Sequence, residues 1–238
     1  MSPPLYPLFF FFLLLFPPSF SAFLAPVKQD QKTRLYTLSV YLKTPLQTTN
    51  LFLDLGASFS WVDCTQNYTS TTYHSIPCNS SLCNSLDKLA CSNCFDSPGP
   101  GCSNDSCALF PENSTTRKVL LAQALVDTLA LPLTNGRNPG RLGLVREFVL
   151  SCLKTPLLKG FPKGTTGLGR SNFSFLALLS SIYSIPYVFA LFLYGSPSAP
   201  GVAFFAMNEP GDGSGCEKQG VLRFKCEPDC VKILSASG

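Results

Sequence analysis

The chain has 238 residues, of which 45% are hydrophobic and 13% charged, and its formal net charge is +4. This length suffices for one large domain or two small ones. The basic residues are scattered, without the runs of five or six that mark nucleic-acid-binding surfaces, so we expect no nucleic-acid partner.

The first segment, residues 1–21, is predicted to be a secretory signal peptide. Its apolar run, Leu8–Phe16, is too short to span a bilayer as a helix, and Ser19 and Ser21 supply small residues for cleavage. The alternative is a short buried or anchoring helix. We therefore expect a secreted, extracellular protein that has no membrane contact after signal cleavage.

The next segment is predicted to be a β-hairpin that ends at Asp54. Residues 36–43 have the period of a half-buried strand, residues 43–47 break it, and residues 51–54 form a second, apolar strand. A carboxylate at the end of an apolar strand is costly to bury unless the following turn donates backbone N–H groups to it. The small residues Gly56, Ala57 and Ser58 predict such a turn, and Asp54 is the candidate catalytic residue.

Eleven cysteines in a chain with few charged residues indicate an oxidising compartment. Eight of them form a group that can close as four disulfides, with the connectivity left open: Cys64, Cys78, Cys83, Cys91, Cys94, Cys102, Cys107 and Cys152. The other three lie after residue 215 and cannot all pair among themselves. A zinc site within residues 91–107 is an alternative that the secreted setting disfavours, so we expect no metal and no cofactor.

Residues 64–111 are rich in Cys, Ser, Asn, Pro and Gly, and are predicted to be an insertion held by disulfides instead of by a core of its own. Five sites match the N-glycosylation pattern: Asn67, Asn79, Asn104, Asn113 and Asn172. Four of them lie in or beside the insertion, which predicts that it faces solvent. The only histidine, His74, has no nucleophile motif in this segment and is expected to be a solvated surface group.

The remaining elements are predicted from their periodicity. The apolar runs 119–122 and 125–129 fit either helix or strand, and residues 147–152 are predicted to be a central strand. Residues 160–170 are a glycine-rich turn without P-loop spacing. Residues 174–185 have helical spacing, with Asn172 or Ser174 as N-cap and Pro186 after the end. Strands at 187–193 and 201–206 follow, and residues 207–238 form a divergent cysteine-containing tail, either evolved or the product of a truncated gene or a mispredicted reading frame.

The segment Asp54-Leu55-Gly56-Ala57-Ser58 with Trp61 resembles the pepsin-type motif Asp-Thr/Ser-Gly-Ser/Ala-Ser-x-x-Trp, except at Leu55. From Leu35 to Phe205 the chain is similar to the plant xylanase-inhibitor-like, basic 7S globulin and extracellular dermal glycoprotein group of that family. The motifs that carry this similarity are Trp61-Val62-Asp63-Cys64, Ser70-Thr71-Thr72-Tyr73, Cys91-Ser92-Asn93-Cys94-Phe95, Pro100-Gly101-Cys102, Asn104-Asp105-Ser106-Cys107, Asn138-Pro139-Gly140-Arg141 and Gly167-Leu168-Gly169-Arg170.

This resemblance implies a mostly β fold: a single pepsin-like N-terminal lobe over residues 22–206, built of antiparallel sheets with one or two short helices. It also implies a bridge between Cys64 and Cys152, and a pair of strands at the two apolar runs that forms a flap over the cleft. Active members carry a Tyr-Gly pair in that flap, and residues 118–131 contain no tyrosine.

Pepsin-type catalysis needs two carboxylates that share one proton. The chain has one such motif, and Leu55 cannot make the hydrogen bonds by which the family's hydroxyl residue joins the two catalytic loops. The resemblance therefore implies a catalytically inactive homologue, with Asp54 vestigial, that binds and inhibits glycoside hydrolases (a xylanase or xyloglucan-specific endoglucanase) in plant cell-wall defence. The alternatives are an aspartic endopeptidase that works as a homodimer of single lobes, and a non-functional fragment that lacks its second lobe.

Overall fold

The computed structural model describes residues 22–65, 68–86, 90–114, 116–134, 139–154, 163–193 and 200–205, and the backbone of residues 231–236. Within these ranges the chain forms fifteen strands and two helices. The strands are β1 (Ala22–Gln29), β2 (Tyr36–Leu42), β3 (Gln47–Asp54), β4 (Ser60–Asp63), β5 (His74–Ser75), β6 (Ala90–Ser92), β7 (Ser106–Leu109), β8 (Glu112–Asn113), β9 (Lys118–Val119), β10 (Ala122–Thr134), β11 (Pro139–Leu153), β12 (Gly164–Gly167), β13 (Val188–Leu193), β14 (Gly201–Phe205) and β15 (Val231–Ala236). The helices are α1 (Ser81–Ser85) and α2 (Phe175–Tyr183).

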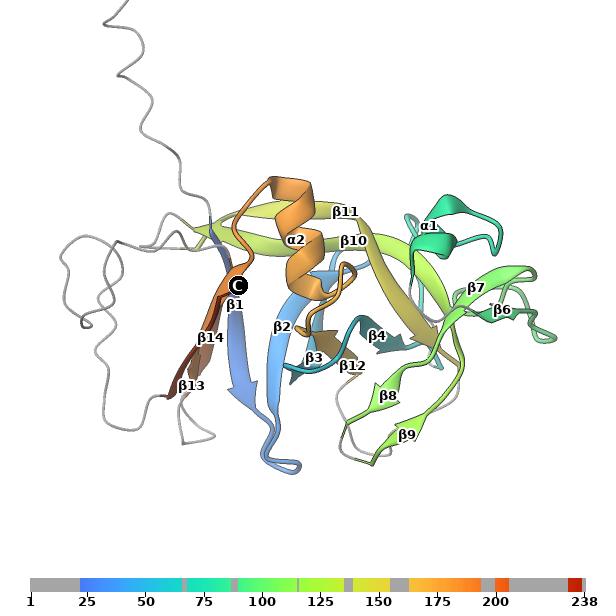
Figure 1. Cartoon of the computed structure of the whole chain (residues 1–238). Coiled ribbons are helices and arrows are strands. Elements are labelled where there is room, and N and C mark those ends of the chain that lie inside the picture. Colours follow the sequence, from blue (N-terminus) through green and yellow to red (C-terminus); the bar gives the residue numbers. More distant parts are fainter. Residues whose placement is uncertain are drawn as a thin grey trace, which may run out of the picture.

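Thirteen strands form one sheet, in the order β15-β13-β14-β1-β2-β3-β12-β4-β11-β10-β7-β6, with β5 paired to β10. Because β10 also pairs with β1 and β2, the middle of the sheet closes on itself in a barrel-like form (Figure 1). The mostly β prediction is confirmed, but the sheet is mixed, since β12 is parallel to β3 and β4 is parallel to β11. The strand β12 lies between β3 and β4, which run in opposite directions. It is therefore parallel to β3 and antiparallel to β4.

The hairpin of β2 and β3 and the helix α2 lie where the sequence predicts them. Ser174 is the N-cap of α2, and its side chain accepts a hydrogen bond from the Ala177 N–H at 3.3 Å. In the core, the ring of Phe175 on α2 packs against Phe148 of β11 and Phe205 of β14, with centroids 5.7 and 5.1 Å apart. Figure 1 shows α2 lying beside the long β10–β11 hairpin, where it covers the core.

The structure corrects one prediction of a strand pair and one prediction of a turn. The apolar runs at 119–122 and 125–129 are not a pair of strands, because β10 continues through the second run to Thr134, and the separate short hairpin here is β8 with β9. The glycine-rich segment predicted as a turn contains β12, whose residues are all buried. A strand enclosed on both faces loses the alternation by which a half-buried strand is recognised.

The strand β1 has no counterpart among the predicted elements. Its side chains alternate between a buried face with Phe23, Ala25 and Val27 and a more exposed face with Pro26. A proline within a short run weakens a strand prediction, although it is tolerated where its missing N–H faces away from a partner.

Among the described residues no helix is long and apolar enough to cross a membrane. The predicted signal peptide, residues 1–21, lies outside the described residues, as do the three cysteines of the tail.

The structure joins the eight cysteines of the first group in four disulfides. Cys64 at the end of β4 is bonded to Cys152 of β11, and the other three bridges are Cys78–Cys91, Cys83–Cys107 and Cys94–Cys102. The segment 64–111 is not merely a surface attachment, because Ile76, Cys83 and Leu109 are buried in the main core. The Cys64–Cys152 bridge attaches this segment to β11, the other three bridges close loops within it, and β5 and β7 pair with β10.

Candidate functional site

Asp54 is the last residue of β3, and the turn after it holds one oxygen of its carboxylate. Oδ1 accepts hydrogen bonds from the backbone N–H groups of Gly56 at 2.9 Å and Ala57 at 3.1 Å. The side chain is half-buried, whereas Leu55 beside it is 44% exposed. Donation of backbone N–H groups by the following turn is the arrangement that the small residues predict.

The loop after β12 fixes this turn from behind. The Leu168 N–H donates to the Asp54 carbonyl oxygen at 2.8 Å, and the Gly169 N–H donates to the Ala57 carbonyl oxygen at 2.9 Å. A Cβ at Gly167 would lie 2.4 Å from the Phe59 carbonyl oxygen, which is closer than real Cβ atoms come. The two loops approach so closely that only glycine fits between them.

Asp54 and Trp61 point to the same face of the sheet. In the pairing of β3, β12 and β4, Thr165 lies beside both Phe52 and Trp61, and side chains two residues apart along a strand share a face, which places Asp54 with Phe52. The neighbouring residues Leu53 and Val62 belong to the main core on the opposite face. Asp54 thus faces away from the core, on the side where Trp61 packs.

Trp61 belongs to a small second cluster with Leu120, Ala122 and Leu153. Its side chain is 2% exposed, and among the residues that the structure describes the indole Nε1–H has no hydrogen-bond acceptor. Leaving a buried donor unpaired costs about 1–3 kcal/mol. The indole is therefore held by packing, at the cost of one unpaired donor.

We expect Trp61→Phe to change the free energy of unfolding by less than about 1 kcal/mol, because removal of the unpaired donor offsets the lost ring volume. The control Phe148→Leu shortens a buried ring that carries no polar atom, and should cost roughly 1–2 kcal/mol. Urea denaturation of both variants with the disulfides intact measures the difference. A loss of more than about 3 kcal/mol in Trp61→Phe would show that Nε1–H has an acceptor such as a buried water.

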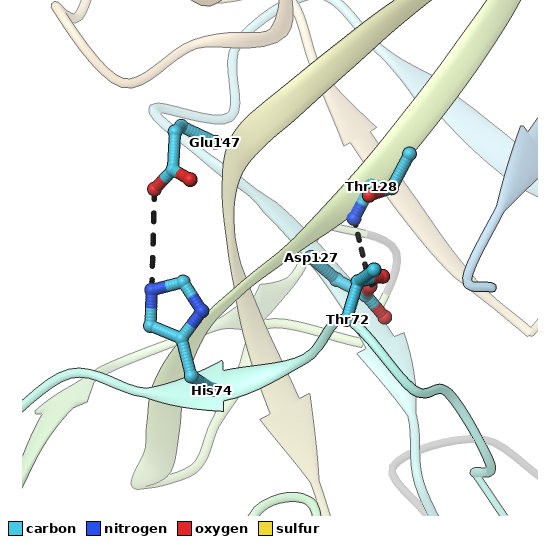
Figure 2. Close-up of polar contacts among 5 residues, drawn as sticks. All are labelled: Thr72, His74, Asp127, Thr128 and Glu147. Atoms are coloured by element: carbon cyan, nitrogen blue, oxygen red, sulfur yellow. Dashed lines mark hydrogen bonds and ion pairs between the residues drawn. The ribbon is translucent and has the colours of Figure 1, made fainter.

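No second acid meets Asp54 within the described ranges, where the only recorded hydrogen bonds of its carboxylate come from Gly56 and Ala57. The one histidine lies elsewhere, on β5, with Nε2 3.9 Å from Glu147 Oε2, and both side chains are mostly exposed (Figure 2). The residues that the structure describes contain no group of three or more His, Cys, Asp or Glu side chains that could hold a metal ion. A single carboxylate cannot act as general base and general acid in the same step.

Sequence inspection missed a buried carboxylate at Asp127 on β10. This residue is fully buried, and its oxygens accept hydrogen bonds from the hydroxyls of Tyr68 at 2.7 Å, Ser70 at 2.9 Å and Thr72 at 2.6 Å, and from the Thr128 N–H at 2.7 Å. Figure 2 shows Asp127 with Thr72 and Thr128. Burial, together with the adjacent carboxylate, raises the pKa of the Tyr68 hydroxyl far above its ordinary value, so this group stays a proton donor. A lone acid within an apolar run was the available signal.

The predicted glycosylation sites differ in exposure. Asn79, Asn104 and Asn172 are exposed, and Asn67 lies outside the described residues. Asn113 is only 3% exposed, and its Oδ1 accepts from the Thr116 N–H at 3.2 Å. A glycan on Asn113 would have to displace this packing.

Comparison with known protein families identifies the family to which this chain belongs. The family model described as "Xylanase inhibitor N-terminal" matches residues 36–206. The chain belongs to the xylanase inhibitor N-terminal family. The resemblance inferred from the sequence motifs is thereby confirmed.

Relatives of this xylanase inhibitor N-terminal chain include proteins named as proteinases. It is 44% identical over 214 residues to "Probable aspartic proteinase GIP1" of Glycine max, covering 87% of this chain and 48% of that protein. The crystal structure of edgp matches with a TM-score of 0.75 at 37% identity, covering 81% of this chain and 47% of that one. An aspartic proteinase from Irpex lacteus matches with a TM-score of 0.51 at 15% identity, covering 82% of this chain and 50% of that one, which shows the pepsin-like fold alone.

The chain spans about half the length of the curated relatives that it matches. The matched family model, described as N-terminal, covers residues 36–206. The resemblance to pepsin-like enzymes implies one catalytic acid in each of two lobes.

Proposed function

We propose that this chain is a secreted, catalytically inactive relative of aspartic peptidases that binds and inhibits glycoside hydrolases, such as a xylanase or a xyloglucan-specific endoglucanase, in plant cell-wall defence. The observation that carries the proposal is the Asp54 site, which has the backbone geometry of a peptidase loop but one carboxylate and an exposed leucine beside it. An inhibitor needs a stable binding surface, and it does not depend on a pair of acids that share a proton.

The cross-linked frame supports this proposal. The four disulfides and the core contacts of segment 64–111 hold that segment rigidly, and rigid surfaces lose little conformational entropy when they bind. The description of the matching family, xylanase inhibitor N-terminal, supplies the class of partner. Disulfides and three exposed glycosylation sequences agree with an extracellular location.

The test uses the purified, secreted full chain in two assays. We expect no cleavage of a denatured protein at acid pH, and saturable inhibition of at least one xylanase or xyloglucan-specific endoglucanase from a panel. The matched variant Asp54→Asn should inhibit as well as the wild type, because the carboxylate does no chemistry. Pepstatin-sensitive cleavage that Asp54→Asn abolishes would reverse the assignment in favour of a homodimeric peptidase. Aggregation of the secreted material would favour a non-functional fragment.

A further inference from the structure

The loop between β6 and β7 presents the side chain of Phe95 completely to solvent. Its exposure is 100%, whereas the next aromatic residue of the segment, Phe110, is 44% exposed. Burial of a phenylalanine side chain stabilises a folded protein by about 1.5–3 kcal/mol, and the exposed Phe95 does not contribute this free energy. Single exposed apolar residues are common on protein surfaces, so the exposure of Phe95 does not by itself indicate a binding site. The rigidity and the charge of its loop are the further observations that indicate one.

The loop that carries Phe95 is held at several points. The Cys94–Cys102 disulfide closes it, and Gly99 and Cys102 exchange two backbone hydrogen bonds of 3.1 and 2.8 Å. Gly101 has a φ of +73°, and a Cβ there would lie 2.9 Å from both the carbonyl oxygen and Sγ of Cys152. The base of the loop therefore packs against the Cys64–Cys152 bridge. Because the loop is already held in place, it loses little conformational entropy when Phe95 binds a partner.

The segment that contains Phe95 carries only negative charges although the chain is basic overall. Between Ala90 and Pro111 the only charged residues are Asp96 and Asp105, and both are exposed. The chain as a whole has a net charge of +4, so this segment differs in sign from the rest of the chain. Complementary potentials favour a partner surface with basic residues.

The loop lies at one end of the molecule. The strand β6 is the last in the sheet order, and β15 is the first. Figure 1 shows β6 and β7 projecting at the end opposite β13, β14 and β15, with β3 and β12 near the middle. A partner seated on Phe95 would leave the strands at the other end uncovered.

We propose that the loop 94–102 is a docking surface for another protein, in which the Phe95 ring enters an apolar pocket whose rim carries Lys or Arg opposite Asp96 and Asp105. A solitary, rigidly presented ring fits a concave pocket better than a flat face, and such aromatic anchors supply much of the binding energy at interfaces. The inference deepens the proposed function, and rests on it only for the choice of glycoside hydrolases as the first natural partners.

The test has two arms with the same three proteins: wild type, Phe95→Ala, and the control Phe110→Ala. In the first arm, a phage-displayed library of small folded domains with randomised loops, which can form concave pockets, is selected on the immobilised wild-type chain. We expect enriched domains whose randomised residues combine apolar with basic side chains, and Kd values weakened about 10- to 100-fold by Phe95→Ala and unchanged by Phe110→Ala. Phe95→Ala should fold normally because the ring is fully exposed.

In the second arm, the hydrolases of the inhibition panel are titrated with the same variants. Loss of inhibition in Phe95→Ala alone would support both proposals. Selected domains that need Phe95, combined with hydrolases that do not bind at all, would support the docking surface and refute the inhibitor function. Selected domains or an inhibited hydrolase that bind Phe95→Ala as tightly as the wild type would overturn the docking surface, as would a selection that yields no Phe95-dependent domain.

Discussion

Replacing Asp127 by alanine is expected to lower the free energy of unfolding by about 3 kcal/mol or more. The substitution leaves the hydroxyls of Tyr68, Ser70 and Thr72 and the Thr128 N–H without their acceptor in a buried site. Each buried donor left unpaired costs about 1–3 kcal/mol, although the hydroxyls can recover part of this by turning toward one another. Ser70 and Thr72 already lie 3.3 Å apart between their hydroxyl oxygens, so the expected loss is well below the full sum.

The measurement is urea denaturation of the oxidised protein, followed by tryptophan fluorescence and circular dichroism. Asp127→Asn should cost less than Asp127→Ala, because an amide keeps one acceptor oxygen of the same shape. Asp96→Ala is the control, since Asp96 is exposed and its loss should change stability by no more than about 0.5 kcal/mol. If Asp127→Ala were as mild as Asp96→Ala, the hydroxyl cluster would not depend on the carboxylate.

Removal of the Cys64–Cys152 bridge should cost about 4–5 kcal/mol, the largest effect that we expect from any of the four disulfides. Its cysteines are 88 residues apart, so the bridge removes more freedom from the unfolded chain than the others do. It also joins the residue after β4, the strand that carries Trp61, to β11. Substitution of both cysteines by alanine avoids leaving a reactive thiol.

The matched comparison is the double substitution of Cys94 and Cys102, which are 8 residues apart and should cost about 2–3 kcal/mol. Both double variants are measured by urea denaturation under conditions in which the remaining bridges stay oxidised. Equal losses in the two variants would contradict an origin in loop length, and would indicate strain in the folded protein or residual structure in the unfolded chain.

Local features of the Asp54 site were predictable from the sequence. Alternation over residues 36–43 and the small residues after Asp54 depend on neighbours within a few positions, and the structure contains the hairpin and the turn that they predict. The N-cap at Ser174 is likewise local. The strand β12 was missed because it forms by pairing with β3 and β4, which lie about a hundred residues earlier in the chain, and because all of its residues are buried, so that no alternation marks it.

By itself the sequence determined a peptidase-type acid beside Leu55 and the positions of a hairpin and a helix, because periodicity and small residues act through neighbouring residues. The tertiary structure alone decided that Asp127 and Asn113 are buried while Phe95 is fully exposed. Segment 64–111 is mostly polar in sequence, and which of its side chains are buried depends on the pairing of β5 and β7 with β10 and on the Cys64–Cys152 bridge to β11. Burial at these positions is set by contacts between residues far apart in the chain, which no local pattern records.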